Sequence, residues 1–316
     1  MLAAASKALF HALAGSQILK NAASRYGMRR PSSPGRRFVA GETLHDAIAA
    51  ARKIEAKGLH HTLDYLGESV RNVNAASAAA DTYRHIIETI VNVGIERNVS
   101  VKLTQLGLDV DRATCVDNLR RMLDPARGTD CFVRIDMEGS AYTAVTLDIF
   151  ETLWHQGYTQ LGVVLQSALR RSESDLDRIN SLGARVRLVK GAYNEPSEVA
   201  YQTKADVDRA FVRLMDKLLR EGRYPAIATH DVALIEETKR RAASLGLGRD
   251  AFEFQMLFGI RRDLQTALAA EGYRVRIYIP FGKEWFPYFM RRLGERPANL
   301  WFVIRGLIQE TRVAQS

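Results

Sequence analysis

Short apolar runs and longer amphipathic stretches alternate along most of the chain. The short runs are rich in β-branched and aromatic residues, as is typical of buried strands. They lie at 59–66, 99–104, 131–137, 160–166, 185–191, 224–230, 251–257 and 273–280. The stretches between them repeat apolar residues with the period of a helix, for example at 75–98, 141–157, 204–222 and 232–245. A further helix over 42–57 precedes the first strand, so the pattern predicts eight strand-helix units after an N-terminal helix.

Alternating strands and helices predict a parallel sheet of the α/β class. Eight such units in about 250 residues match a closed (β/α)8 TIM-type barrel, which we expect to be distorted and to carry extra N-terminal helices. The main alternative, an open doubly wound sheet, usually has a Gly-rich phosphate turn after its first strand. No such turn is present, since Gly246 and Gly248 lack the third glycine and precede a strand. We therefore predict a basic N-terminal arm over 1–41 and a barrel domain over 42–316.

The net charge of +9 comes mostly from the N-terminal arm. Residues 1–41 hold seven basic side chains and no Asp or Glu, whereas the other 275 residues hold 38 basic and 36 acidic side chains. The main body is therefore nearly neutral, and no run resembles a basic helix or an aromatic platform for nucleic acid. We expect no nucleic-acid partner.

The composition of the arm leaves its role open. Ala, Arg and Ser dominate it, as in a mitochondrial transit peptide, but a basic helix lying across the domain or on an anionic membrane has the same composition. No apolar run reaches the roughly 18 residues that span a bilayer. We expect a cytoplasmic protein, peripheral at the inner face of the membrane, or one on the mitochondrial matrix side if the arm is a transit peptide. Two cysteines without CxxC spacing predict neither a disulfide framework nor a metal site.

Polar side chains end all eight predicted strands. In a barrel these ends meet at one rim, where active sites of this fold are built. Burial of such groups without partners is costly, which favours a polar ligand or a shared hydrogen-bond network. With Arg187, the two lysines among them predict an electropositive rim and an anionic ligand. The eight residues are Asp64, Lys102, Asp136, Gln166, Lys190, His230, Gln255 and Tyr278.

A second polar cluster lies in the last predicted helix, WFPYFMRRLGERPAN. Tyr288, Arg291, Arg292 and Glu295 are spaced i, i+3, i+4 and i+7, which places them along one helical stripe. Arg291 and Glu295 form either a surface pair of small energy, or part of a group whose arginines cover the rim and bind a carboxylate. The spacing alone favours neither interpretation.

Eight sequence blocks, in order, resemble the motifs of proline dehydrogenases, most of all the single-function bacterial enzymes. The blocks are VKLTQLGLD, RIDMEGS, GVVLQSALRR, RVRLVKGAY, IATHD, FEFQML, IYIPFG and YFMRRLGERPAN. The likeness runs from about Phe38 to about Gly306. It implies a non-covalent FAD, no metal, and oxidation of L-proline to Δ1-pyrroline-5-carboxylate by hydride transfer from proline C5 to flavin N5. A membrane quinone would then accept the electrons, which implies peripheral membrane contact.

The resemblance also implies a role for each matching residue. Lys102, Arg291 and Arg292 would hold the proline carboxylate, and Asp136 would steady those arginines. Arg187 would lie nearest the flavin N5, and it and Asp136 are the expected catalytic residues. The ring of the substrate would be enclosed by Tyr193, Leu257, Tyr278 and Tyr288, of which Tyr278 would disfavour a 4-hydroxylated ring. The expected FAD contacts are Met137, Gln166, Arg187, Lys190, Gly191, Ala192, Thr229, His230, Gln255 and Glu295.

Three other functions remain as alternatives at this point. A flavin-free aldolase would form a Schiff base on Lys102 or Lys190, which requires a lysine desolvated enough to be neutral. An FAD-bearing barrel reductase would take its electrons from NADH. A binding module would act through its basic arm on nucleic acid or lipid. The residues indicate no general base and no oligomeric state.

Overall fold

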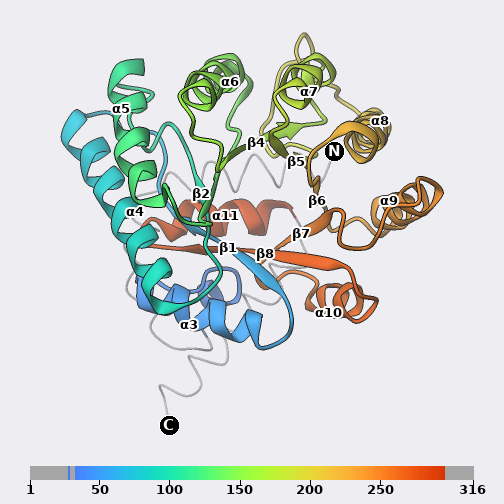
Figure 1. Ribbon diagram of the computed structural model, residues 1–316, viewed down its shortest axis with the longest axis horizontal. Helices are drawn as coiled ribbons and strands as arrows, with labels where there is room; N and C mark the ends of the chain where they lie inside the picture. Colours follow the sequence, from blue (N-terminus) through green and yellow to red (C-terminus); the bar gives the residue numbers. More distant parts are fainter. Residues whose placement is uncertain (1–27, 29–32, 296–316) are drawn as a thin grey trace.

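The computed structural model describes Met28 and residues 33–295, and it is a closed barrel of eight parallel strands (Figure 1). Each strand pairs with the next along the chain, and β8 pairs with β1. The strands are β1 (His60–Tyr65), β2 (Asn98–Val101), β3 (Phe132–Ile135), β4 (Leu161–Gln166), β5 (Arg185–Val189), β6 (Ala226–Ala228), β7 (Glu253–Leu257) and β8 (Arg274–Phe281). The predicted (β/α)8 barrel is confirmed.

A helix follows every strand, and Figure 1 shows those after β1 to β7 around the barrel. In chain order these are α4 (Val73–Val93), α5 (Arg112–Leu123), α6 (Ser140–His155), α7 (Ser172–Ser181), α8 (Lys204–Glu221), α9 (Val232–Ser244) and α10 (Arg262–Ala270). The extra N-terminal elements are α3 (Leu44–Glu55) and a short 3-10 helix, η1 (Pro34–Arg37); another, η2 (Asp124–Ala126), follows α5. None of the helices in the described ranges is long and apolar enough to cross a bilayer.

The helix predicted over 75–98 is too long at its C-terminal end. It ends at Val93 because Gly94 adopts a left-handed conformation with a φ of 71°, which terminates a helix. Asn98 instead begins β2. At the other end, the Asn72 side chain caps the helix by accepting a hydrogen bond from the Ala75 amide.

The two faces of the barrel strands differ in chemistry. Outward-facing residues such as Leu63, Val99 and Ile277 are buried under the helices and form the main apolar core. Inward-facing residues include many polar and charged side chains, which is unusual because branched apolar residues fill most barrels of this type. These inward side chains hydrogen-bond to one another, as between Thr62 of β1 and Ser100 of the neighbouring β2 at 3.3 Å. The barrel interior is therefore a polar network that leads to the carboxyl ends of the strands.

Helix α11 (Trp285–Glu295), which follows β8, lies near the centre of the view in Figure 1 and not in the outer ring. Its apolar residues form a second core with Phe38, Val39 and Leu66. The chain just before the predicted domain boundary at residue 42 thus packs on the barrel, and the Ala40 amide donates to the Pro280 carbonyl at 2.9 Å. Most of the predicted arm and the chain beyond 295 lie outside the described residues, and the boundary remains a prediction.

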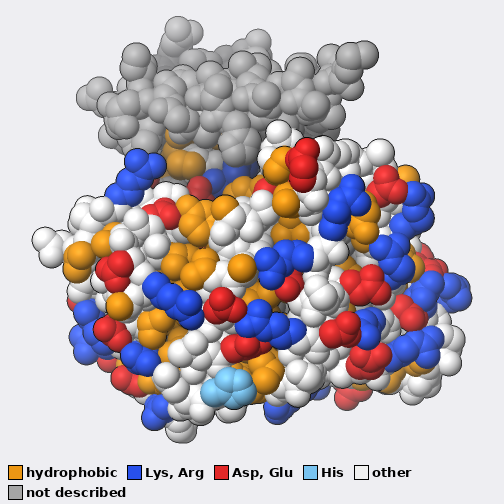
Figure 2. Space-filling view, turned by 90° about the horizontal axis from the view of Figure 1, so that it is seen from above, with side chains coloured by type: hydrophobic (Ala, Val, Ile, Leu, Met, Phe, Trp, Pro, Cys, Tyr) orange, Lys and Arg blue, Asp and Glu red, His pale blue; other side chains and the backbone are white. Residues whose placement is uncertain are grey.

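On the face shown in Figure 2, basic and acidic side chains are interspersed. Charged residues pair within and between helices, as Arg241 of α9 does with Glu237 of α9 and Asp216 of α8. This agrees with the nearly neutral charge of the main body.

Replacing Gly259 by Ala is expected to lower the free energy of unfolding by about 3 kcal/mol. Gly259 has a φ of 76°, and an added Cβ would lie 1.7 Å from the Arg37 carbonyl oxygen. Gly58 provides a matched control, since its φ is 70° but a Cβ there meets nothing within 4 Å. Gly58→Ala should therefore cost only the conformational part, about 1 kcal/mol. Denaturant melts measure both, and equal losses would show that the close approach to Arg37 contributes nothing.

A buried ion pair at the amino end of the barrel predicts acid sensitivity. Arg276 donates to both carboxylate oxygens of Glu253, at 2.8 and 2.9 Å. Burial alone would raise the pKa of Glu253, but the Arg276 guanidinium lowers it to about 2. A carboxylate whose pKa falls on folding stabilises the fold above its ordinary pKa, and this contribution is lost as the pH falls toward 2.

Glu253→Gln should accordingly cost about 3 kcal/mol at pH 7, because it removes the buried carboxylate partner of Arg276 and leaves only the more exposed Glu96, at 2.7 Å. The cost should shrink in melts at progressively lower pH. Glu236→Gln, in a surface pair with Lys239, should cost less than about 0.5 kcal/mol. A loss for Glu253→Gln that is independent of pH would contradict the ion-pair explanation.

Candidate active site

Asp136, directly after β3, is the centre of a hydrogen-bonded cluster at the carboxyl end of the barrel. Its Oδ1 accepts from Nη1 of Arg187 at 2.6 Å, and its Oδ2 accepts from the Tyr278 hydroxyl at 2.7 Å. Arg187 also donates to the Ser100 hydroxyl at 3.1 Å and to Oε1 of Gln255. Residues of β2, β5, β7 and β8, together with Asp136 after β3, therefore hold one buried guanidinium and one carboxylate in fixed orientation.

Lys102 lies beside this cluster, directly after β2. Its ammonium is 3.4 Å from Oδ1 of Asp64 and 4.0 Å from Oδ2 of Asp136. Burial would lower the pKa of Lys102, but these two carboxylates hold it above its ordinary value. Lys102 is thus a cation, which does not suit the neutral amine that a Schiff-base aldolase requires.

The same surroundings raise the pKa values of two neighbouring groups. Burial raises the pKa of Asp64, and the nearby Asp136 adds to this effect while Lys102 opposes it. Burial, with the charges of Asp136 and Asp64, also holds the pKa of the Tyr278 hydroxyl well above its ordinary value. Tyr278 therefore remains a neutral hydrogen-bond donor to Asp136.

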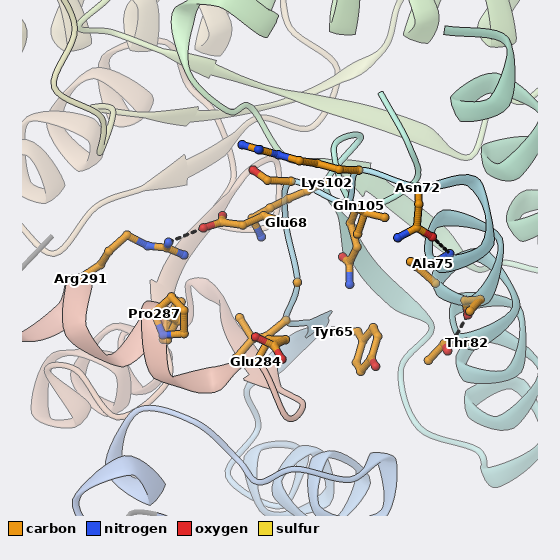
Figure 3. Close-up of a pocket in the computed structure, with 18 residues that line it drawn as sticks. Tyr65, Glu68, Asn72, Ala75, Thr82, Lys102, Gln105, Glu284, Pro287 and Arg291 are labelled. Atoms are coloured by element: carbon orange, nitrogen blue, oxygen red, sulfur yellow. Dashed lines mark hydrogen bonds and ion pairs between the residues drawn. The ribbon is translucent and has the colours of Figure 1, made fainter. Parts of the chain in front are cut away.

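A cavity of about 480 Å³ opens between α11, α4 and the loop from 66 to 72 (Figure 3). Lys102, Tyr288 and Arg291 line it, which brings together three residues predicted to bind the substrate. The Arg291 guanidinium donates to Oε1 of Glu68 at 2.6 Å, as the dashed line in Figure 3 shows. Arg292 lies 5.1 Å from the centre of the Tyr288 ring. Helix α11 thus contributes one cation, Arg291, to the cavity that Lys102 also lines.

Tyr193 follows β5 and is partly exposed in its loop. Burial raises the pKa of its hydroxyl to about 12, with Lys102 opposing and Glu68 adding to the shift. Arg291 is also among the charges that act on it. Tyr193 therefore lies on the same side of the barrel as the cavity.

The prediction that Asp136 steadies Arg291 is wrong. Asp136 was predicted to steady Arg291 and Arg292, but its oxygens bind Arg187 and Tyr278, and Arg291 binds Glu68. Asp136 lies inside the mouth of the barrel, where side chains of the barrel strands bind both of its carboxylate oxygens. Glu68 lies in the loop after β1, on the side where α11 crosses.

The predicted electropositive rim is also wrong as stated. Lys102 is paired with Asp64, and Arg187 with Asp136. Lys190 binds Asp208 of α8 at 2.6 Å and Asp231, the cap of α9, at 2.9 Å. Each of the three cations therefore has carboxylate partners from neighbouring elements. Arg291 of α11 likewise has a carboxylate partner, Glu68.

Apart from Glu295 in α11, the residues predicted to contact FAD lie in or directly after strands β3 to β7. Gln166, Thr229 and Met137 are buried, whereas Gly191 and Ala192 are exposed. His230 accepts a hydrogen bond on Nε2 from the Leu257 amide at 3.0 Å, which fixes its ring beside the expected ring contact Leu257. The side chain of Glu295 lies outside the described part. Within residues 33–295, no group of His, Cys, Asp or Glu has the arrangement of a metal site.

Sequence reasoning missed Glu68 and gave no role to Asp64 or Ser100. Asp64 was visible as a polar strand end, and adjacency of β1 to β2 in a barrel would have placed it near Lys102. Glu68 follows β1 by three residues in a loop without helical or strand period, so no pattern distinguished it.

Comparison with known proteins identifies the family. The proline dehydrogenase family model matches residues 47–305. The chain is 44% identical over 277 residues to the proline dehydrogenase of Deinococcus radiodurans, covering 86% of this chain and 89% of the relative. The chain belongs to the proline dehydrogenase family. It is also 38% identical over 298 residues to proline dehydrogenase 2 of Bacillus subtilis, covering 94% of this chain and 97% of that enzyme.

The fold agrees with this membership. The structure matches that of proline utilization A from Bdellovibrio bacteriovorus inactivated by N-propargylglycine, with a TM-score of 0.77 and 26% identity over 82% of this chain. The chain covers 32% of that longer protein. The enzyme is therefore an oxidoreductase that oxidises proline, the first step of proline degradation, and the aldolase and NADH-reductase alternatives are not favoured.

Proposed function

We propose that the enzyme oxidises L-proline to Δ1-pyrroline-5-carboxylate at the mouth of the barrel, with non-covalently bound FAD as its cofactor. The observation that carries this assignment is the cavity that Arg291 of α11 and Lys102 of the barrel both line. Two cations from different elements can hold one carboxylate in a defined orientation. Orientation matters because a hydride is transferred only from a carbon held near its acceptor.

In this proposal Lys102, Arg291 and Arg292 bind the proline carboxylate. Lys102 contributes a fixed charge, since Asp64 and Asp136 keep it protonated and in place. Arg291 uses Nη1 for Glu68 and offers its remaining donors to the substrate. The ring would then lie among Tyr193, Leu257, Tyr278 and Tyr288, with Tyr278 disfavouring a hydroxylated ring.

The residues at the ends of β4 to β7 fit an FAD. Gly191 has a φ of 111°, and a Cβ there would lie 2.9 Å from Oε1 of Gln166, so the bare backbone is exposed at the rim. A flat, polar-edged cofactor requires such close approach to backbone together with amide and guanidinium donors. Gln166, Arg187, Gln255 and Thr229 supply those polar groups, with Met137, Lys190, Ala192, His230 and Glu295 as further predicted contacts. Bound there, FAD would accept the hydride from proline.

Electron transfer to a membrane quinone is the further part of the proposal. It would require at least transient contact with the inner face of the membrane by a protein located in the cytoplasm. The basic arm over 1–41 has the charge for such contact with anionic lipid. Removing residues 1–37 should leave turnover with an artificial acceptor intact and reduce turnover with a vesicle-bound quinone.

The decisive experiment is the visible absorption spectrum of the purified protein under anaerobic conditions, before and after L-proline. We expect a yellow protein that bleaches with L-proline and does not bleach with NADH. A protein that stays colourless after incubation with FAD would refute the cofactor assignment.

A further inference from the structure

The loop between β1 and α4, which carries Glu68, is attached to Thr104 by two hydrogen bonds. The Ser69 amide donates to Oγ1 of Thr104 at 2.9 Å, and the Val70 amide donates to the Thr104 carbonyl at 3.1 Å. Ser69 has a φ of 56°, a conformation that costs free energy for a residue with a side chain. The contacts to Thr104 therefore hold this loop in a shape that it would not adopt by itself.

Thr104 is in turn oriented by Glu138. Thr104 is fully buried, and its hydroxyl donates to Oε2 of Glu138 at 2.6 Å. Its amide donates to Oε1 of the same carboxylate at 3.1 Å. A hydroxyl has one hydrogen, and Glu138 accepts it, so the lone pairs of Oγ1 are available to Ser69. The carboxylate thus makes Thr104 an acceptor for the loop.

The residue before Ser69 is the partner of Arg291. Glu68 accepts from Nη1 of Arg291 at 2.6 Å, and both residues line the cavity that Lys102 also lines (Figure 3). A change in the position of Ser69 therefore changes the position of the carboxylate that orients Arg291. Glu138, Thr104, Ser69 and Glu68 form a continuous connection from the barrel to α11.

We propose that Thr104, oriented by Glu138, is a positioning residue that fixes Glu68 and thereby aims Arg291 at the substrate carboxylate. This inference rests on the proposed role of Arg291 in proline binding. Thr104 itself does not touch the reacting atoms. Its loss should weaken ground-state and transition-state binding equally, which raises KM and leaves kcat nearly unchanged.

The first test compares Thr104→Val with Thr104→Ser. Valine keeps the shape and removes the hydroxyl, and we expect the KM for proline to rise about tenfold with kcat within about twofold. Serine keeps the hydroxyl, and its KM should stay within about twofold of the original enzyme. Thr143→Val is the matched control, because Thr143 is equally buried and its hydroxyl has no hydrogen-bond partner. An unchanged KM in Thr104→Val, or an equal rise in Thr104→Ser, would overturn the proposal.

The second test asks whether Thr104 acts through Glu68. Thr104→Val, Glu68→Gln and the double variant are compared, and the double variant should have nearly the KM of Glu68→Gln alone. Independent, multiplying effects would show that Thr104 acts elsewhere. If Thr104→Val does not fold, Glu138→Gln replaces it in the same cycle, with the same expected result.

A third measurement does not depend on catalysis. Hydrogen exchange of the peptide that contains Ser69 and Val70 should be faster in Thr104→Val than in Thr104→Ser or Thr143→Val. Equal exchange would overturn the attachment of the loop. If the original enzyme does not bleach with proline, the proposed function fails, while this exchange difference still reports on the loop.

Discussion

Replacing Arg291 by Met is expected to raise the KM for proline on the order of 100-fold to 1000-fold and to leave bound FAD in place. Met is unbranched and replaces the aliphatic part of the Arg side chain, so packing of α11 against Phe38 and Val39 should persist. What is lost is the guanidinium, one of the three cations predicted to bind the substrate carboxylate. Burial lowers the pKa of Arg291, but Glu68 more than offsets this, so the charge is present at every working pH.

The measurement is steady-state kinetics with an artificial acceptor, together with the flavin absorbance of the purified variant. Arg220→Met is a suitable control, because Arg220 also forms a carboxylate pair, with Asp216, on the far surface of α8. Its KM should equal that of the original enzyme. An unchanged KM in Arg291→Met, or loss of the flavin, would remove Arg291 from the substrate site.

The barrel could be predicted because each strand combines outward apolar residues with a polar end, and this pattern recurs eight times. Strand ends could not be predicted from this pattern where the local backbone conformation sets them. The strand expected over 224–230 is only Ala226–Ala228, since Tyr224 has a φ of 48° that does not fit a strand. Such backbone conformations depend on packing and leave no signal in hydrophobic periodicity.

For the candidate site, the strand pattern predicted which residues lie together, but not which of them form ion pairs. Parallel strands place Lys102, Asp136, Arg187 and Tyr278 at one rim whatever the details, and the structure has them in one cluster. The partner of Arg291 depends on where α11 crosses the barrel. Glu68 is 223 residues away along the chain, and no local pattern connects the two.

Replacing Arg187 by Met is expected to lower kcat on the order of 100-fold to 1000-fold with little change in KM. Hydride transfer places negative charge on its acceptor, and a buried cation held in advance next to that charge stabilises the transition state. Arg187 is only 4% exposed, and its donors are already aimed by Asp136, Ser100 and Gln255. The guanidinium therefore needs no rearrangement when the charge develops.

The variant Arg187→Lys tests whether the charge of the guanidinium or its planar geometry matters for kcat. Lysine keeps the positive charge but has no planar fork, so it cannot serve Asp136, Ser100 and Gln255 together. If the charge dominates, kcat should fall only about tenfold in Arg187→Lys, and this kcat should be well above that of Arg187→Met. Equal losses would mean that Arg187 acts mainly by holding Asp136 and Gln255, and a rise in KM without a fall in kcat would place it with the substrate carboxylate. Because Asp136 keeps the Tyr278 hydroxyl and Lys102 as neighbours in both variants, its own position should change little, and the difference in kcat reports on the guanidinium.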